Sequence, residues 1–254
     1  MQTSPSVALV TGGSRGLGKS IALHLAKQGH HVILTYRSKQ SEANDVVSQI
    51  EAMGQMAVAL ALNASDSSSF ARFADQVRQV LLAQWRCTTF NILINNAGTG
   101  THASLMDTTE AQFDELVNVH FKGVFFLTQK LLPLMADGGR IVNVSSGLTR
   151  FALPGYSAYA AMKGAVEVMT RYMAKELGAR NIAVNTVAPG AIATDFGGGA
   201  VRDNPQLNAF VAAQTALGRV GEADDIGAMV ASLVSADNRW VNAQRIEVSG
   251  GMFV

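Results

Sequence analysis

The chain has 254 residues, 48% of them hydrophobic, which is enough apolar material to bury a large core within one domain. Its 20 basic and 19 acidic residues leave a formal net charge of +1, so the composition gives no electrostatic basis for binding nucleic acid or a membrane surface. No apolar run approaches the roughly 18 residues that cross a bilayer, the N-terminus lacks the build of a secretory signal, and the single cysteine, Cys87, matches a reducing compartment, so we expect a cytoplasmic protein.

Apolar, strand-like runs alternate along the chain with longer amphipathic stretches. We predict strands at 6–11, 31–35, 56–62, 91–95, 140–145, 182–187 and 244–248. We predict helices near 16–28, 41–53, 66–84, 109–136, 157–178 and 222–236. This alternation predicts an α/β fold in which a parallel sheet carries helices on both faces.

The chain shows no internal repeat and no proline-rich linker, so residues 1–254 are expected to form a single domain. One irregular stretch, 190–218, interrupts the alternation and contains a short helix expected around Asn204–Gln214. Loops of this length inside compact domains often serve as active-site lids, and we expect that role here.

The first predicted strand runs directly into a glycine-rich turn, Thr11-Gly12-Gly13-Ser14-Arg15-Gly16-Leu17-Gly18, and a helical pattern follows. Strand, glycine turn and helix are the context required of a dinucleotide-binding loop, although the spacing is Gly-x3-Gly-x-Gly rather than Gly-x-Gly-x-x-Gly. Gly12 permits the tight turn, Gly16 allows close approach of the backbone, and Gly18 lets the helix pack near the strand. The helix N-terminus would face a pyrophosphate. The predicted cofactor contacts in this loop are Gly12, Ser14, Arg15, Gly16, Leu17 and Gly18.

A serine, a tyrosine and a lysine follow the fifth predicted strand. Tyr159 and Lys163 lie four residues apart, on one face of the predicted helix 157–178, and Ser146 precedes Tyr159 by thirteen residues. A nearby ammonium favours the phenolate, so we expect Lys163 to lower the pKa of Tyr159 from its ordinary value of about 10. The Ser146 hydroxyl can hydrogen-bond a substrate oxygen. Together the three side chains suit proton transfer to or from an alcohol or carbonyl oxygen.

These motifs share the order and spacing of a known enzyme family. The chain resembles the classical short-chain dehydrogenases/reductases in Thr11-Gly12-x3-Gly16-x-Gly18, Asn95-Asn96-Ala97-Gly98, Ser146, Tyr159-x3-Lys163 and Pro189-Gly190. The resemblance extends from Val7 to Gly251 and points to the branch that contains the 3-oxoacyl-acyl-carrier-protein reductases and related carbonyl reductases. It implies a doubly wound, three-layer Rossmann fold with a mostly parallel seven-stranded sheet. It also implies that Tyr159 supplies the proton, Ser146 orients the oxygen, and Lys163 holds the nicotinamide ribose.

The residues after the second predicted strand bear on the choice between the two nicotinamide cofactors. An NAD-specific site places an acid there to accept from the ribose hydroxyls, whereas this chain has Tyr36-Arg37-Ser38. The resemblance brings Arg15 and Arg37 to one pocket, where guanidinium groups suit a 2′-phosphate and Ser38 can donate a further hydrogen bond. We therefore favour NADP(H), and NAD(H) is kept as the alternative.

The resemblance implies further cofactor contacts from the loops after the third, fourth and sixth strands. A polar side chain after the third strand would face adenine, the backbone after the fourth would line the cofactor cleft, and the loop after the sixth would hold the nicotinamide. These residues are Asn63, Ala64, Asn95, Ala97, Gly98, Pro189, Gly190, Ile192 and Thr194.

The chain departs from the resemblance in the long predicted helix 109–136. Classical members place an asparagine there that helps hold a proton-relaying water, and matching on Gly123-Val124-Phe125 puts His120 at that position. Asn118 should point elsewhere, because two helical steps rotate by roughly 200°. Histidine can pass protons near its ordinary pKa of about 6.5, or can merely fill space beside the helix. We expect a supporting role in the relay, visible as an ionisation in the pH profile of turnover.

The expected activity is that of an NADP(H)-dependent oxidoreductase interconverting a small-molecule ketone or aldehyde and an alcohol, similar to a 3-oxoacyl reductase. Two alternatives stay open: an NAD-dependent alcohol, steroid or sugar dehydrogenase, and a non-catalytic cofactor-sensing regulator. Ser146, Tyr159 and Lys163 argue against the sensor, which needs no proton-transfer groups. No metal site is predicted, because no histidine has paired spacing with cysteine or carboxylates. The resemblance further implies a homotetramer.

Overall fold

The computed structural model describes residues 5–254, whose strands form one seven-stranded sheet in the order β3-β2-β1-β4-β5-β6-β7. All six strand pairs are parallel, which confirms the predicted doubly wound sheet. The strand order reverses between β1 and β4, and in open parallel sheets this reversal opens a crevice at the carboxyl ends. The strands are β1 (Val7–Val10), β2 (His31–Tyr36), β3 (Ala57–Ala61), β4 (Phe90–Asn95), β5 (Met135–Val144), β6 (Ala183–Pro189) and β7 (Arg245–Val248).

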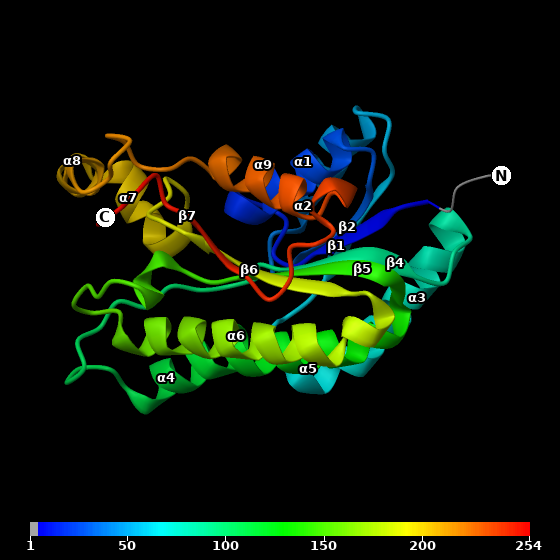
Figure 1. Cartoon of the computed structure of the whole chain (residues 1–254), viewed down its shortest axis with the longest axis horizontal. Coiled ribbons are helices and arrows are strands. Elements are labelled where there is room, and N and C mark those ends of the chain that lie inside the picture. The colour runs from blue at the N-terminus through cyan, green and yellow to red at the C-terminus, as the bar shows by residue number, and fades with distance from the viewer. Residues whose placement is uncertain (1–4) are drawn as a thin grey trace.

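Helices cover both faces of the sheet, giving the three layers of a Rossmann fold (Figure 1). One face carries α1 (Gly16–Lys27), α2 (Gln40–Glu51) and α9 (Ala223–Leu233). The other carries α3 (Phe70–Trp85), α5 (Gly123–Leu131) and α6 (Ser157–Glu176). Three shorter helices lie toward the carboxyl ends of the strands: α4 (Glu110–Leu116), α7 (Ala200–Asp203) and α8 (Pro205–Ala213).

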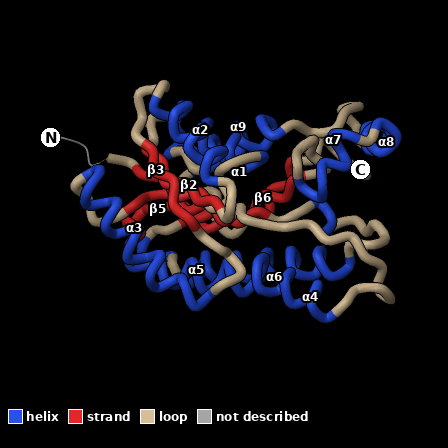
Figure 2. The backbone as a smooth tube through the Cα atoms, turned by 180° about the vertical axis from the view of Figure 1, so that it is seen from behind, coloured by secondary structure: helices blue, strands red, loops and turns tan. Residues whose placement is uncertain are grey.

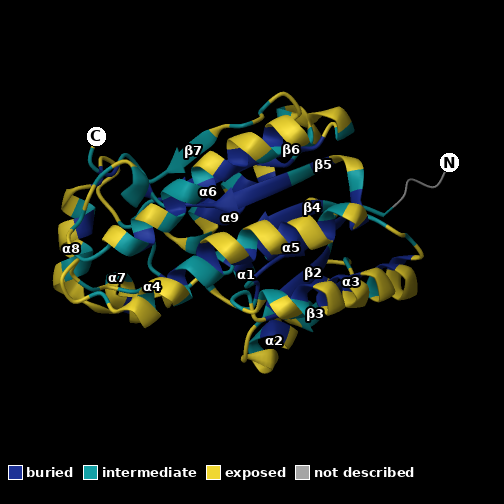
Figure 3. Ribbon diagram, turned by 90° about the horizontal axis from the view of Figure 1, so that it is seen from below, coloured by how far each residue is buried: buried dark blue, intermediate teal, exposed yellow. Residues whose placement is uncertain are grey.

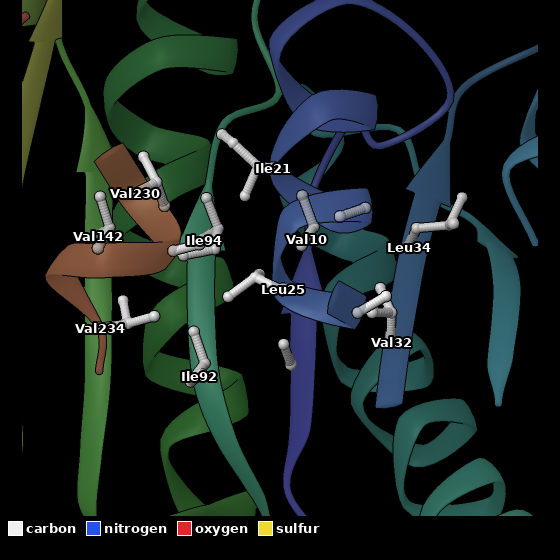
Figure 4. Close-up of a cluster of buried hydrophobic side chains, with 14 of the residues drawn as sticks. Val10, Ile21, Leu25, Val32, Leu34, Ile92, Ile94, Val142, Val230 and Val234 are labelled. Carbon is white, nitrogen blue, oxygen red and sulfur yellow. The ribbon is translucent and has the colours of Figure 1, made fainter. Parts of the chain in front are cut away.

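Two apolar clusters hold the layers together. On the first face, Ile21 and Leu25 of α1 and Val230 of α9 pack onto valines and isoleucines of the central strands (Figure 4). On the second, α3 contributes Phe70 and Phe73. Full burial of one such side chain stabilises the fold by about 1.5–3 kcal/mol. The rigid sheet therefore fixes the positions of the loops at its carboxyl edge.

The long helix predicted at 109–136 is confirmed over residues 110–134, although its hydrogen bonding changes along its length. It consists of α4, a π-helical segment at Val117–Lys122, α5, and a 3₁₀ turn at Leu132–Leu134. Pro133 cannot continue the helical hydrogen bonding, and Met135 already pairs with Phe90 as the first residue of β5. At the start of α5, directly after the π-helical segment, the chain passes close to the loop after β3: a Cβ on Gly123 would overlap the Ala64 carbonyl oxygen.

The outward faces of α4, α5 and α6 are exposed to solvent (Figure 3). These faces carry large aromatic side chains that are between 39% and 68% exposed: Phe113, Phe125, Phe126 and Tyr172. Within residues 5–254, no helix has the length and apolar character needed to cross a membrane.

The stretch 190–218 contains α7 and α8, and the C-terminus lies beside it (Figure 2). The short helix expected around Asn204–Gln214 is confirmed as α8, whose first turn is capped by the Asn204 side chain.

Candidate active site

The carboxyl edge of the sheet gathers the motifs that the sequence singled out. The glycine turn leaves β1, Asn95–Gly98 leaves β4, Ser146 follows β5 and Pro189 ends β6. Since these strands are neighbours in the sheet, their loops converge on the crevice beside the strand-order reversal.

The glycine turn has the backbone geometry that its sequence predicts. Gly12 and Gly16 adopt φ of +64° and +53°, in the left-handed region that favours glycine. A Cβ on Gly18 would overlap the Gly12 carbonyl oxygen. The Thr11 hydroxyl accepts hydrogen bonds from the backbone N–H of Asn96 (2.9 Å) and Ala97 (3.0 Å), which ties this turn to the loop after β4.

The start of α1 fits a dinucleotide pyrophosphate. No side chain among residues 5–254 hydrogen-bonds the first backbone N–H groups of α1, and Arg15 at the N-cap is extended. Free N–H groups at a helix N-terminus attract anions. Ser14 is half-buried and Leu17 packs against the core.

Both arginines proposed to bind a phosphate have carboxylate neighbours. Arg15 Nη1 lies 3.7 Å from Asp195 in the stretch 190–218, and Arg37 Nη1 lies 3.6 Å from Glu115 of α4. The two guanidinium side chains are 57% and 66% exposed, so these ion pairs are weak and open to competition by another anion. Beside Arg37, Tyr36 is half-buried and Ser38 is exposed.

The loops after β3 and β4 place their predicted residues differently. Asn63 is exposed, and its side-chain oxygen accepts from the Ser65 N–H (3.2 Å) and hydroxyl (3.0 Å). Asn95 is buried and donates to Thr128 Oγ1 (3.0 Å) and Asn143 Oδ1 (2.8 Å), so its side chain points into the protein interior. Asn95 can therefore line the crevice only through its backbone. Ala64, Ala97 and Gly98 are half-buried or exposed at the same edge.

The loop after β6 runs along the other side of the crevice. Thr194 is 8% exposed and packs near Gly16 of the glycine turn, and the Ile192 carbonyl accepts from the Thr194 N–H (2.9 Å). Further along, Phe196 lies 5.9 Å, centroid to centroid, from the Tyr159 ring. The loop that begins at Pro189 and Gly190 and continues through Ile192 and Thr194 therefore runs from the end of β6 to the glycine turn and to the Tyr159 ring.

Tyr159 and Lys163 lie on the buried face of α6 and are only 8% and 5% exposed. The Lys163 ammonium donates to the Val144 carbonyl oxygen (2.8 Å) and lies 5.6 Å from the centroid of the Tyr159 ring. Ser146 begins the 3₁₀ turn Gly147–Thr149, and its Oγ accepts from the Leu148 N–H (3.2 Å). The structure therefore brings all three side chains together.

The expectation that Lys163 lowers the pKa of Tyr159 is wrong for this geometry. Burial of the phenol raises its pKa above the ordinary value of 10, and the opposing hydrogen bond with Ser146 is too weak to reverse this. Burial also lowers the pKa of Lys163 to about 8. Tyr159 is therefore a protonated donor at neutral pH.

His120 lies in the π-helical segment and is 1% exposed. Its ring packs edge-on to Tyr159 with the centroids 5.2 Å apart, and its Nε2 donates to the Thr99 carbonyl oxygen (2.7 Å). Nδ1 has no hydrogen-bond partner among the described residues. Burial and the nearby Lys163 charge lower the pKa of His120 to about 3. The expected ionisation near pH 6.5 is therefore wrong: the imidazole stays neutral, with Nδ1 as an acceptor.

A test of this assignment is the acid stability of a His120→Asn variant. Between pH 6.5 and about 3 the unfolded chain binds the His120 proton and the folded chain does not, so the free energy of unfolding falls as the pH drops through this range. The variant lacks this loss. We expect urea denaturation at pH 7 and pH 4.5 to show a smaller drop for the variant than for the wild type. Equal drops would contradict a neutral, buried His120.

Several residues around the site were not predicted. Three of them are contact partners of predicted residues: Thr99 contacts His120, Glu115 contacts Arg37, and Asp195 contacts Arg15. Their local sequences give no signal that predicts these contacts. Glu167, Arg245 and Glu247 form a half-buried charge cluster behind Ser146. Glu167 lies one helical turn after Lys163, and Arg245 and Glu247 share one face of β7, so their spacing was a usable signal.

Comparison with known proteins agrees with the geometry. The family described as enoyl-(acyl carrier protein) reductase matches residues 12–253. A 3-oxoacyl-acyl-carrier-protein reductase of Staphylococcus aureus is 36% identical, over 97% of this chain and 98% of the relative.

Solved structures superimpose along the whole chain. The promiscuous reductase LugOII, which catalyses keto-reduction at C1 during lugdunomycin biosynthesis, is 38% identical with a TM-score of 0.94, and 100% of both chains is covered. The angucycline C-6 ketoreductase LanV, solved with bound NADP, is 35% identical with a TM-score of 0.93, over 98% of this chain and 95% of the other. The chain therefore belongs to the classical short-chain dehydrogenase/reductase family, in the branch of the 3-oxoacyl-acyl-carrier-protein reductases, whose members are oxidoreductases acting on CH–OH and carbonyl groups.

Proposed function

We propose that this protein is an NADP(H)-dependent carbonyl reductase in which Tyr159 is the proton donor. The observation that carries the proposal is the buried phenol of Tyr159, with the Lys163 ammonium 5.6 Å from its ring centroid and Ser146 beside it, at the edge of the sheet where the start of α1 fits a dinucleotide. A cofactor-sensing regulator would have no use for this arrangement.

When bound, a nicotinamide cofactor would supply a hydride to the carbonyl carbon, or would accept one in the reverse direction. Ser146 donates a hydrogen bond to the substrate oxygen and orients it. As negative charge develops on that oxygen, Tyr159 transfers its proton, so that the reaction forms one C–H and one O–H bond. The Lys163 ammonium stabilises the phenolate that remains. His120 contributes a neutral acceptor, Nδ1, which suits holding a water beside Lys163 in the relay.

The cofactor preference rests on Arg15 and Arg37. Both are exposed at the rim of the crevice, and no acid follows β2. The ketoreductase LanV, similar along the whole chain, binds NADP. NAD(H) remains the alternative cofactor.

We expect Arg37→Asp to reverse the cofactor preference. The new carboxylate repels a 2′-phosphate and accepts from a free ribose hydroxyl, and it also lies near Glu115, which adds to the repulsion. The ratio of kcat/KM with NADPH to that with NADH should fall by at least tenfold, and by more than after Arg15→Ala. Lys39→Asp, two residues further and paired with Glu42, is the matched control. A wild type that prefers NADH would contradict the assignment, as would an unchanged ratio in the variant.

The substrate class is proposed as ketones flanked by apolar groups, with 3-oxoacyl thioesters first. Phe196 near Tyr159 and Phe151, packed on Phe253 with the rings 4.8 Å apart, give the region an apolar character. A panel of 3-oxoacyl thioesters, polycyclic ketones, aldehydes, sugars and steroids, run with both cofactors, tests this. If no compound of the panel oxidises NADPH, the cofactor-sensing regulator is favoured. If activity is seen only with NAD⁺ and alcohols, the NAD-dependent dehydrogenase is favoured.

Three further expectations remain proposals. We expect residues 1–254 to act as one catalytic domain with 190–218 as its lid, and we expect a cytoplasmic location. We also expect a homotetramer, because the apolar face of α4, α5 and α6 has the exposed aromatic side chains of an interface. Light scattering at micromolar concentration measures the assembly, and a monomer would contradict it.

A further inference from the structure

A chain of alternating charges runs from α6 to the C-terminal tail behind Ser146. It consists of Glu167, Arg245, Glu247 and Arg150, whose side chains are between 13% and 37% exposed. Arg245 Nε donates to Glu167 Oε1 (2.9 Å), and Arg245 Nη1 donates to Glu247 Oε2 (3.0 Å). Arg150 binds Glu247 with two hydrogen bonds, of 2.7 and 2.8 Å. This row of ion pairs joins segments that lie about a hundred residues apart in the sequence.

The Glu167 end of this chain holds the residues on both sides of Ser146. Glu167 Oε1 accepts from the hydroxyl of Ser145 (2.7 Å) and lies 2.7 Å from the hydroxyl of Thr149. The Thr149 hydroxyl also lies 2.9 Å from the Ser146 carbonyl oxygen. Its single proton can serve only one of these two acceptors at a time.

Arg245 completes the enclosure of Ser146. Its Nη2 lies 3.1 Å from Thr149 Oγ1 and 3.4 Å from the Ser146 carbonyl oxygen. With Arg245 donating to Thr149 Oγ1, that hydroxyl is free to direct its proton at Glu167 or at Ser146. The hydroxyls of Ser145 and Thr149 are thus held from α6, and the Ser146 carbonyl oxygen is approached from β7, while the Ser146 Oγ is left to face the Tyr159 phenol.

The other end of the chain anchors Arg245. Glu247 also accepts from the Ser249 hydroxyl (2.7 Å), and Arg150 donates to the carbonyl oxygens of Met252 (2.5 Å) and Phe253 (3.0 Å). Hydrogen bonds with Arg150 hold the pKa of Glu247 well below its ordinary value, so this carboxylate stays charged throughout the neutral range. Arg245 is therefore paired with Glu247 on one side and with Glu167 on the other, which limits its freedom to swing away from Thr149.

We propose that Glu167 and Arg245 are positioning residues for Ser146, which fix the direction of its hydroxyl by holding the side chains of Ser145 and Thr149 on either side of it and its own carbonyl oxygen. This rests on the proposed function, in which Ser146 orients the substrate oxygen. Neither residue touches the crevice atoms of Tyr159 or Lys163, so both act through Ser146.

A double-mutant cycle separates positioning from a general structural role. Misplacement of a catalytic group by about 1 Å can cost roughly 10²-fold in rate. We expect Glu167→Gln to lower kcat by roughly 10- to 100-fold, with the Kd for NADPH changed by less than about twofold. In a Ser146→Ala background the same change should cost less than about twofold, because the group that Glu167 positions is already absent. An equal loss in both backgrounds would overturn the proposal, and so would no loss in either.

Two further variants test the same proposal in case the Glu167→Gln protein does not fold. Thr149→Val keeps the shape of Thr149 and removes only its hydroxyl, and it should show the same dependence on Ser146. Arg245→Lys should do so as well, because an ammonium cannot reproduce the fork of bonds made by a guanidinium. Arg180→Lys is the matched control: Arg180 bridges Asp137 (2.7 Å) and two carbonyl oxygens at the opposite edge of the sheet. It should leave kcat unchanged.

Hydrogen exchange tests the same proposal without using activity. The backbone N–H groups of Leu148 and Arg150 donate to Ser146 Oγ and to the Gly147 carbonyl oxygen. We expect a peptide spanning residues 144–151 to exchange faster in Glu167→Gln than in the wild type or in Arg180→Lys. Unchanged exchange would overturn the positioning role. If the wild type reduces no carbonyl compound but exchange still responds, the proposed function fails while the structural link between Glu167 and Ser146 stands.

Discussion

Tyr159→Phe should lower kcat for carbonyl reduction by at least roughly 10²–10⁴-fold, the usual cost of losing a general acid. The substitution keeps the ring that packs against His120 and Phe196 and removes only the phenolic hydroxyl. Burial keeps the phenol protonated at neutral pH, so the substitution removes the proton that the proposed mechanism transfers to the substrate oxygen. Steady-state kinetics with NADPH and the best substrate of the panel measure the loss.

The control is Tyr172→Phe, the same change on the same helix at a side chain that is 68% exposed. It should leave kcat unchanged. NADPH binding, followed by fluorescence, should be similar in both variants and in the wild type. A Tyr159→Phe enzyme that keeps more than a tenth of the wild-type turnover would remove Tyr159 from the role of proton donor.

The fold was predictable because its signals are local. Apolar strand runs and amphipathic helices each have their own period. The apolar run of β1 indicates an interior parallel strand, and all four of its residues are buried in the structure. The π-helical segment within the helix at 109–136 was not predictable in this way, because the close approach of Gly123 to the Ala64 carbonyl oxygen beside it joins residues that are remote in sequence. Pro133 marked the end of the helix but not the π-helical segment before it.

At the site, spacing predicted which residues meet but not their protonation. The i, i+4 relation placed Tyr159 and Lys163 together, as the structure has them. The sign of the Tyr159 pKa shift depends instead on how completely the ring is buried, and that is decided by α6 packing on the sheet. The same holds for His120. A histidine is expected to titrate near neutral pH, but burial and the nearby Lys163 charge lower its pKa and keep the ring neutral. The protonation states of both side chains therefore depend on their tertiary environment, which the spacing of residues in the sequence does not specify.

Lys163→Met should reduce kcat by roughly 10²–10³-fold, the cost of removing one preorganised charge from a transition state. Methionine has a similar length and fills the same buried space, but it cannot stabilise the phenolate that Tyr159 becomes. The loss of a buried charge removes a desolvation cost, so the melting temperature at pH 7 should change by only a few degrees. Lys175→Met, at an exposed position of the same helix, is the matched control and should be silent.

The pH profile gives the same experiment a second readout. With a pKa of about 8, Lys163 is charged at pH 7 and loses its proton at higher pH, so wild-type kcat for reduction should fall as the pH rises above 8. This ionisation should be absent from Lys163→Met, whose low rate should stay flat across the same range. If the variant keeps most of its turnover, the lysine is only a buried anchor on the Val144 carbonyl oxygen. If the fall above pH 8 persists in the variant, it belongs to another group, and the electrostatic role of Lys163 would have to be abandoned.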